Sequence, residues 1–240
     1  MGLTVCVDGD DTLWENEPIF ARSYEHFDAV VSDHARIPVR EALLAVERRN
    51  LATFGYGVKS FTLSMIEAAI EVTDGTVPTS VIAGLVDVCR DMLQHPVELL
   101  DGVAEVIPQL AERWPVLLVT KGDLLHQESK VAQCGLAEFF GAVQIVSEKD
   151  PSTYRQIASS HGIDVSDLVM VGDSRRSDID AVLEAGGWGI HVPQGREWEH
   201  DVAAIGAHHD ERWWVVSSMW EVPGIIEVIA DRASRCGAQS

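Results

Sequence analysis

Three carboxylates gather where the first apolar run of the chain ends. The run Leu3–Val7 is followed by Asp8, Asp10 and Asp11, and then by Thr12. Carboxylates this close repel one another, so crowding raises the cost of keeping them ionised. We therefore expect positive charge from elsewhere to neutralise them. A neutralised carboxylate can act as a nucleophile, and a second one beside it can exchange protons with a leaving group or a water.

Polar side chains also follow the later apolar runs of the chain. They are Thr120, Lys121 and Gly122 after the second run, Lys149 just after the third, and Gly172, Asp173, Ser174 and Asp178 after the fourth. In an open parallel sheet, ligands bind beyond the carboxyl ends of the strands. We therefore expect these residues to meet the first acidic turn at one edge of a sheet.

The oxygen atoms of this set suit Mg²⁺, which prefers oxygen ligands and keeps several waters. We expect Asp8 and Asp173 to be side-chain ligands, and a backbone carbonyl near Asp10 to be another. Asp178 is expected to anchor a metal-bound water or to orient Lys149.

A phosphate group is the expected partner of the cation. The Lys149 ammonium, the Thr120 hydroxyl and the N–H groups of the turns at Gly9–Asp10 and Lys121–Gly122 are expected to bind its oxygens. Asp8 could then attack phosphorus and form an aspartyl-phosphate. Asp10 could protonate the leaving oxygen and later activate a water.

The apolar runs that precede these residues predict a doubly wound α/β sheet. The expected strands are Leu3–Val7, Val116–Thr120, Val143–Val146, Leu168–Val171, Gly189–Val192 and Trp214–Val216. The expected helices between and after them are Gly102–Arg113, Leu124–Gln133, Ser152–His161, Ser177–Glu184 and Glu221–Ala230. Several strands are apolar throughout, as in a parallel sheet that is covered on both faces.

One interval breaks the alternation of strands and helices. Residues 15–96 show only helical periodicity, divided by Pro38, by Phe54–Gly57 and by Pro78. We expect an all-helical insertion at 15–96 and a sheet domain made of residues 1–14 and 97–240.

The residues quoted above resemble the four motifs of the haloacid dehalogenase-like (HAD) hydrolase superfamily. They are D8-G-D-D-T12, the strand ending in Thr120, Lys149, and G172-D173-S-R-R-S-D178. The resemblance implies a Rossmann-like core with a helical C1-type cap, Mg²⁺ dependence and an aspartyl-phosphate intermediate. It implies Asp8 as nucleophile, Asp10 as acid/base, Thr120 and Lys149 as phosphate ligands, and Asp8, Asp10 (through its carbonyl) and Asp173 as metal ligands. Thr12, Ser174 and Asp178 are expected to support that site.

Two details refine the implied class. The dehalogenase members lack the second aspartate of the first motif, which Asp10 supplies here, so the pattern favours a phosphatase. The usual glycine before the threonine is replaced by Asp11, whose side chain must face away from the phosphate.

Composition limits the partners and the cellular location. The formal charge is −20, from 38 acidic and 18 basic residues, which argues against nucleic acid and acidic membrane surfaces. No signal peptide or membrane span is recognised, and the four cysteines are scattered, so we expect a cytoplasmic protein with reduced thiols. Monomer and homodimer both stay open.

The substrate is the least defined part of the prediction. We expect a small phosphorylated metabolite, with Trp14, Asn16, Tyr56 and Lys59 as candidate contacts in or near the insertion. A phosphotransferase or phosphomutase would use the same motifs. A non-catalytic phospho-aspartate signalling module also carries paired acids, a Thr and a Lys, although on a shorter chain.

Overall fold

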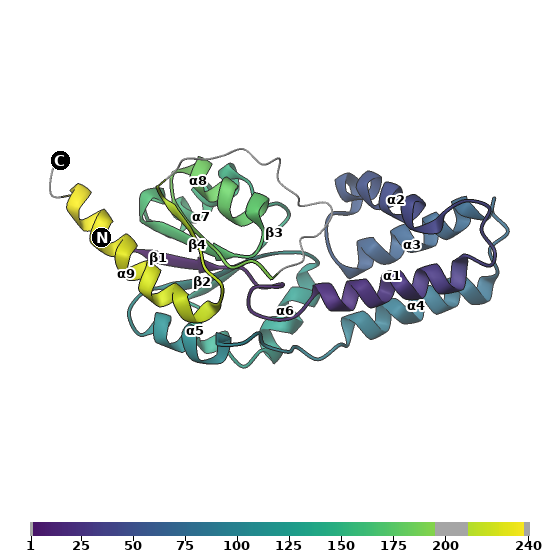
Figure 1. Ribbon diagram of the computed structural model, residues 1–240, viewed down its shortest axis with the longest axis horizontal. Helices are drawn as coiled ribbons and strands as arrows, with labels where there is room; N and C mark the ends of the chain where they lie inside the picture. Colours follow the sequence, from purple (N-terminus) through teal and green to yellow (C-terminus); the bar gives the residue numbers. More distant parts are fainter. Residues whose placement is uncertain (1, 195–210, 238–240) are drawn as a thin grey trace. The chain divides into compact units, whose positions relative to one another are not determined.

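The computed structural model describes residues 2–194 and 211–237, and these form two compact units (Figure 1). The first unit comprises residues 1–15, 97–120 and 130–240, and the second comprises residues 16–96 and 121–129. The sequence-based division kept residues 121–129 with the sheet, whereas they group with the helical unit. Among the described residues, no helix has the length and apolar character needed to cross a membrane.

The first unit is built on a six-stranded sheet with the strand order β3-β2-β1-β4-β5-β6. The strands are β1 (Thr4–Val7), β2 (Val116–Lys121), β3 (Ala142–Val146), β4 (Leu168–Gly172), β5 (Trp188–His191) and β6 (Trp213–Val215). The pairings from β2 across to β6 are parallel. The order reverses direction around β1 and β4, which places the site-bearing strand ends at the topological switch point.

Helices cover both faces of the sheet (Figure 1). Helices α5 (Val103–Ala111) and α9 (Val222–Gly237) share one core with Val5 and Val7 of β1. Helices α7 (Pro151–Ser160) and α8 (Ala181–Ala185) pack on the opposite side with Cys6. Neighbouring residues of β1 are therefore buried on opposite faces, which explains why the strand is buried at every position and apolar from Val5 to Val7.

Helix α6 (Leu124–Gln133) follows β2, and its residues are divided between the two units at Lys130. The described residues of this unit also form short elements: the 3₁₀ turns η1 (Ala137–Phe139), η2 (Val165–Asp167) and η4 (Met219–Glu221), and the π-helical segment η3 (Arg175–Asp180).

The second unit contains helices α1 (Glu17–Val31), α2 (Val39–Phe54), α3 (Val58–Val72) and α4 (Thr79–Leu93). Their apolar faces enclose a separate core that includes Phe27, Leu43, Met65 and Leu85. Pro38 and Pro78 precede α2 and α4, as expected because proline cannot continue a preceding helix.

Two backbone hydrogen bonds tie together the segments of the sheet unit that flank the insertion. Glu15 N–H donates to Glu98 O at 3.0 Å, and Leu100 N–H donates to Leu13 O at 3.0 Å. The chain thus leaves and re-enters the sheet unit along two adjacent backbone segments.

The predicted α/β sheet with an inserted helical segment is confirmed, and two predicted helices need correction. The helix expected at 177–184 begins as the π-helical segment η3 and becomes α-helical only at Ala181. Helix α9 continues to Gly237, beyond the expected end at Ala230.

Candidate active site

A buried lysine joins two of the predicted acidic residues. Asp8 is the first residue after β1, Lys149 follows β3 and Asp178 lies in η3. Lys149 Nζ lies 2.5 Å from Asp8 Oδ1 and 2.7 Å from Asp178 Oδ1. All three residues are at most 6% exposed. Three separate strand ends therefore converge on one ammonium group, as the sequence predicts.

Asp178 reaches this position because Gly172 has no side chain. A β-carbon at Gly172 would lie 2.2 Å from Asp178 Oδ2, which is far closer than atoms can approach. The same Oδ2 accepts a hydrogen bond of 3.1 Å from Ser174 N–H. The Ser174 hydroxyl in turn caps η3 by accepting from Ser177 N–H at 3.0 Å. Both carboxylate oxygens of Asp178 are therefore held by donors of the protein itself.

Asp173 is joined to the first motif through Thr12. The Thr12 hydroxyl donates to Asp173 Oδ1 at 3.2 Å and accepts from Asp173 N–H at 3.0 Å. His191, the last residue of β5, lies with Nε2 2.7 Å from the Asp173 carbonyl oxygen, so its ring N–H must donate. These contacts fix Asp173 beside Asp8.

Burial makes the acidic cluster costly to ionise. Desolvation raises the pKa of Asp8 to about 7, with a further increase from Asp178 and an opposing effect of Lys149. Desolvation and the charges of Asp8 and Asp178 also raise the pKa of Asp173. Although burial opposes it, the charges of Asp178 and Asp8 raise the pKa of Lys149, so the lysine stays protonated. One ammonium group does not neutralise three carboxylates, and a divalent cation would lower the pKa of both Asp8 and Asp173.

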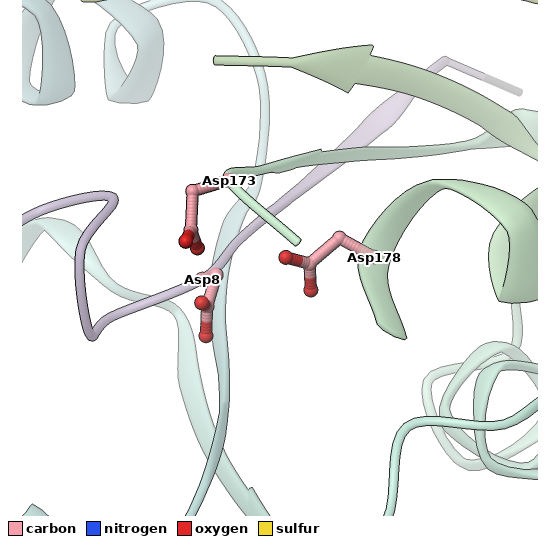
Figure 2. Close-up of side chains that lie close together, drawn as sticks. All are labelled: Asp8, Asp173 and Asp178. Carbon is pink, nitrogen blue, oxygen red and sulfur yellow. The ribbon is translucent and has the colours of Figure 1, made fainter. Parts of the chain in front are cut away.

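The donor set fits Mg²⁺. Asp8, Asp173 and Asp178 each place one carboxylate oxygen within 4.8 Å of the others (Figure 2). Asp178 already accepts from Lys149 and Ser174, which identifies it as the support of the cluster. Asp8 and Asp173 are the better candidates for direct ligands, in keeping with the preference of Mg²⁺ for a small number of carboxylates.

Asp10 lies two residues beyond Asp8 and is held by a different pair of donors. Its Oδ1 accepts from Trp14 Nε1 at 2.6 Å and from Lys130 Nζ at 2.8 Å. Thr120 is fully buried at the end of β2. Its hydroxyl oxygen would lie 3.2 Å from a β-carbon at Gly9, so the hydroxyl reaches the backbone of the acidic turn.

Asp11 stands where the resembled family usually has a glycine, and its backbone conformation explains how the turn accommodates the change. Asp11 has a φ of +58°, in the left-handed region that glycine enters most easily. Aspartate is one of the few other residues that tolerate this conformation. The turn is therefore kept although the glycine is absent.

The remaining predicted residues belong to the helical unit. There the Lys121 ammonium lies 4.2 Å from the centroid of the Tyr56 ring, and Lys59 Nζ lies 2.8 Å from Asp123 Oδ1. Gly122 has a φ of +135°, and Asn16 precedes α1. These positions are compatible with substrate contact, and their roles stay predictions.

Trp14 differs in environment from the other substrate candidates. It is 1% exposed within the core of the sheet unit, and its indole N–H bonds Asp10. We therefore assign Trp14 to the support of Asp10 rather than to contact with substrate.

Sequence reasoning missed Lys130 and His191. Lys130 lies within an amphipathic helix, where a lysine is ordinarily a solvated surface residue, and His191 ends a strand that carried no motif. A signal existed for Lys130, because its helix directly follows β2, the strand that carries Thr120. Cys6 is buried, and desolvation raises the pKa of its thiol to about 12.

Comparison with known proteins finds a matching family and solved structures that share the fold of this chain. Residues 3–186 match the family described as haloacid dehalogenase-like hydrolase. The chain is similar to a haloacid dehalogenase-like family hydrolase from Xanthomonas campestris, with 40% identity, a TM-score of 0.87, and coverage of 98% of this chain and 94% of that one. A 2-haloacid dehalogenase from Pseudomonas syringae pv. tomato shares the fold, with 21% identity, a TM-score of 0.65, and coverage of 95% and 99%.

Curated relatives match a smaller part of the chain. The N-acylneuraminate-9-phosphatase of Mus musculus is 33% identical over 148 residues, which cover 59% of this chain. The match spans 57% of the length of that relative. The family match, the solved relative and the convergent acidic site together identify the chain as an enzyme that belongs to the haloacid dehalogenase-like hydrolase family.

Proposed function

We propose that this enzyme is a Mg²⁺-dependent phosphomonoester hydrolase that acts on a small phosphorylated metabolite through an aspartyl-phosphate intermediate. The observation that carries the proposal is the pair Asp8 and Asp10. The two carboxylates leave the same turn, yet one is held by Lys149 and the other by Lys130 and Trp14. Separate partners allow one carboxylate to act as nucleophile while the other handles protons.

In the first step, an Asp8 carboxylate oxygen attacks phosphorus, and the bond between phosphorus and the leaving oxygen breaks. The leaving oxygen takes its proton from the carboxylic acid of Asp10, so the product leaves as a neutral alcohol. Lys149, 2.5 Å from Asp8, would offset charge on the phosphoryl oxygens as they approach. Thr120 is proposed to bind the same oxygens, together with Lys121 and Gly122.

In the second step, water is added to the aspartyl-phosphate. Asp10, now ionised, takes a proton from the water while the water oxygen attacks phosphorus. The bond between phosphorus and the Asp8 oxygen breaks, inorganic phosphate leaves, and both carboxyl groups return to their starting state. Because Asp10 gives one proton and regains one, no other proton donor is required.

Asp8, Asp173 and the Asp10 carbonyl would hold Mg²⁺, which when bound supplies Lewis-acid stabilisation of the phosphoryl charge. Thr12 and His191 would keep Asp173 oriented toward that position. Asp178 would hold the Lys149 ammonium beside Asp8 through its own ion pair with the lysine.

Two alternatives use part of the same site. A phosphomutase would return the phosphoryl group to a sugar, and it would use the same described residues of the sheet unit as a phosphatase. Membership of a hydrolase family argues against a non-catalytic signalling module. The presence of Asp10 argues for phosphoryl transfer, because a displacement of halide does not need a proton donor at that position.

The curated relatives guide the choice of substrate. Since they are named N-acylneuraminate-9-phosphatases, we include N-acylneuraminate 9-phosphate in the proposed substrate class of small sugar or sugar-acid phosphates. Tyr56 and Lys59 are proposed as its contacts in the helical unit. Metabolites of this kind are consistent with the proposed cytoplasmic location.

The test is a screen of phosphorylated metabolites for release of inorganic phosphate. N-acylneuraminate 9-phosphate, hexose phosphates and p-nitrophenyl phosphate would each be assayed with MgCl₂ and with EDTA. We expect release that depends on MgCl₂ and favours one small metabolite. Isomerised hexose phosphate without phosphate release would instead establish a mutase, and no turnover of any compound by the folded protein would refute the proposal.

A further inference from the structure

The carboxylate of Asp10 is held on one side by two nitrogen donors from different parts of the sheet unit. Trp14 Nε1 and Lys130 Nζ both bond the same oxygen, Oδ1, at 2.6 Å and 2.8 Å. The Lys130 side chain is 8% exposed, whereas that of Asp10 is 27% exposed. The two donors are therefore more buried than the carboxylate that they hold, as expected for a support.

The indole of Trp14 is itself fixed against the turn that carries Asp10. The backbone N–H of Trp14 donates to the Gly9 carbonyl oxygen at 3.3 Å. The backbone N–H of Asp11 donates to the Trp14 carbonyl oxygen at 2.8 Å. A β-carbon at Gly9 would lie 2.7 Å from the Trp14 ring, so the ring packs directly on the backbone between Asp8 and Asp10. The indole N–H thus has a defined position relative to the turn.

Lys130 approaches the same oxygen from α6. Its carbonyl accepts from Cys134 N–H at 2.9 Å, just beyond the end of that helix, and both residues are buried. An exposed ion pair contributes little because water and side-chain entropy compete with it. A buried ammonium has no such freedom, and separating it from its carboxylate would leave a desolvated charge.

Two donors on one oxygen have a specific chemical consequence. They restrict rotation of the carboxyl group about the bond from Cβ to Cγ, because both bonds converge on Oδ1. An acid so oriented presents its proton in one direction instead of sampling several, and proximity and orientation are large contributors to catalysis.

We propose that Lys130 is a positioning residue for Asp10: with Trp14, it holds Oδ1 and so fixes the direction in which the carboxyl group exchanges the proton with the leaving group. This inference rests on the proposed phosphatase function. Because Lys130 bonds the carboxylate of Asp10, its effect is expected on proton transfer.

The leaving group provides the test. Phenyl phosphate and p-nitrophenyl phosphate have nearly the same shape, but p-nitrophenolate is a much weaker base and needs little help from an acid. The ratio kcat/KM reports only the steps up to the first phosphoryl transfer. For Lys130→Met we expect kcat/KM to fall about 10- to 100-fold with phenyl phosphate, within the range of general acid catalysis, and by less than about threefold with p-nitrophenyl phosphate.

Matched variants separate positioning from folding. Lys130→Arg keeps a donor and should recover most of the activity with phenyl phosphate. Arg113→Met removes an exposed partner of Glu227 in the same unit and should leave both substrates unaffected. Trp14→Phe keeps an aromatic ring and removes the N–H donor, so it should show the same dependence on the leaving group if Lys130→Met fails to fold.

The outcomes of this experiment distinguish a failure of the positioning role of Lys130 from a failure of the proposed phosphatase function. Equal losses with the two substrates would overturn the positioning role and leave the phosphatase proposal intact, as would no loss with either. A folded wild-type protein that hydrolyses neither these two substrates nor any compound of the metabolite screen with MgCl₂ would overturn the proposed function, and this inference with it.

Discussion

The Oδ2 of Asp178 occupies the space in which Gly172 would carry a β-carbon, only 2.2 Å away. The carboxylate rests against the end of β4, where it also bonds Ser174 N–H and Lys149. The last motif therefore needs glycine at position 172, because any side chain there would prevent Asp178 from coming close enough to hold Lys149.

Gly172→Ala should displace Asp178 and loosen Lys149. We expect kcat to fall by about 100-fold, since misplacement of a catalytic group by about 1 Å has effects of that size. Overpacking should also lower the free energy of unfolding by about 1–3 kcal/mol. Gly84→Ala is the matched control, because a β-carbon there meets nothing within 4 Å and alanine favours the helix α4. Steady-state kinetics and urea unfolding measure the two effects, and wild-type kcat in Gly172→Ala would contradict the steric fit.

Asp8→Asn should remove the nucleophile with almost no change in volume. Turnover should fall by roughly 1,000-fold or more, since nucleophilic side chains act as part of a unit. Incubation with ³²P-labelled substrate should label the wild-type protein at an acid-stable position and leave the variant unlabelled. Residual turnover near the wild-type value would refute the role of Asp8.

Asp10→Asn should cripple both proton transfers. We expect a loss of roughly 100- to 10,000-fold with phenyl phosphate, the usual contribution of general acid–base catalysis. With p-nitrophenyl phosphate the first transfer should survive, so the phosphorylated enzyme should accumulate and a burst of p-nitrophenol should precede slow turnover. If the variant turns over normally with phenyl phosphate, Asp10 is only a structural acid.

The stabilising effect of Mg²⁺ should grow with pH. The pKa of Asp8 is raised from 3.8 to about 7 in the folded protein, so the folded state binds the proton more tightly than the unfolded state. In EDTA, the contribution of Asp8 to stability is therefore lost as pH rises from the lower value through the upper one. A cation that binds ionised Asp8 and Asp173 should offset that loss. The rise in Tm on adding MgCl₂ should thus be larger at about pH 8 than at about pH 5.5, because protons compete with the metal at the lower pH.

Differential scanning calorimetry of wild-type protein and Asp8→Asn measures this effect. The variant has no titrating carboxyl at that position, so the dependence of its metal-induced shift on pH should be weaker. An equal rise in Tm at both pH values in the wild-type protein would contradict the raised pKa of Asp8.

The sequence predicts the sheet and the acidic cluster well because local residue patterns mark the strands, the helices and the polar residues that follow the strands. Strand β2 begins at Val116 and α6 spans 124–133 as expected, since apolar runs and helical periodicity mark these elements directly. Asp8, Lys149 and Asp178 converge because parallel strands bring their carboxyl ends together. Their roles follow from their chemistry and from the resemblance to a family.

The contacts that the sequence does not reveal are those between elements without a motif. Lys130 meets Asp10 across 120 positions of sequence, and nothing in its own helix marks it. The π-helical segment at 175–180 contains Asp178, whose seating against Gly172 is a tertiary contact that helix propensity does not encode. The grouping of residues 121–129 with the helical unit likewise depends on contacts that periodicity does not encode, such as that between Lys59 and Asp123.

The backbone pairing of Glu15 with Glu98 has a consequence for how such enzymes diversify. Since the two segments are neighbours, the eighty or so residues between them enter the sheet unit at a single place, much as a loop enters a hairpin. Chain insertions at such places disturb few contacts of the host. The scaffold that holds the chemistry can therefore exchange one specificity module for another, or shorten it to a few residues, without shifting the register of any strand.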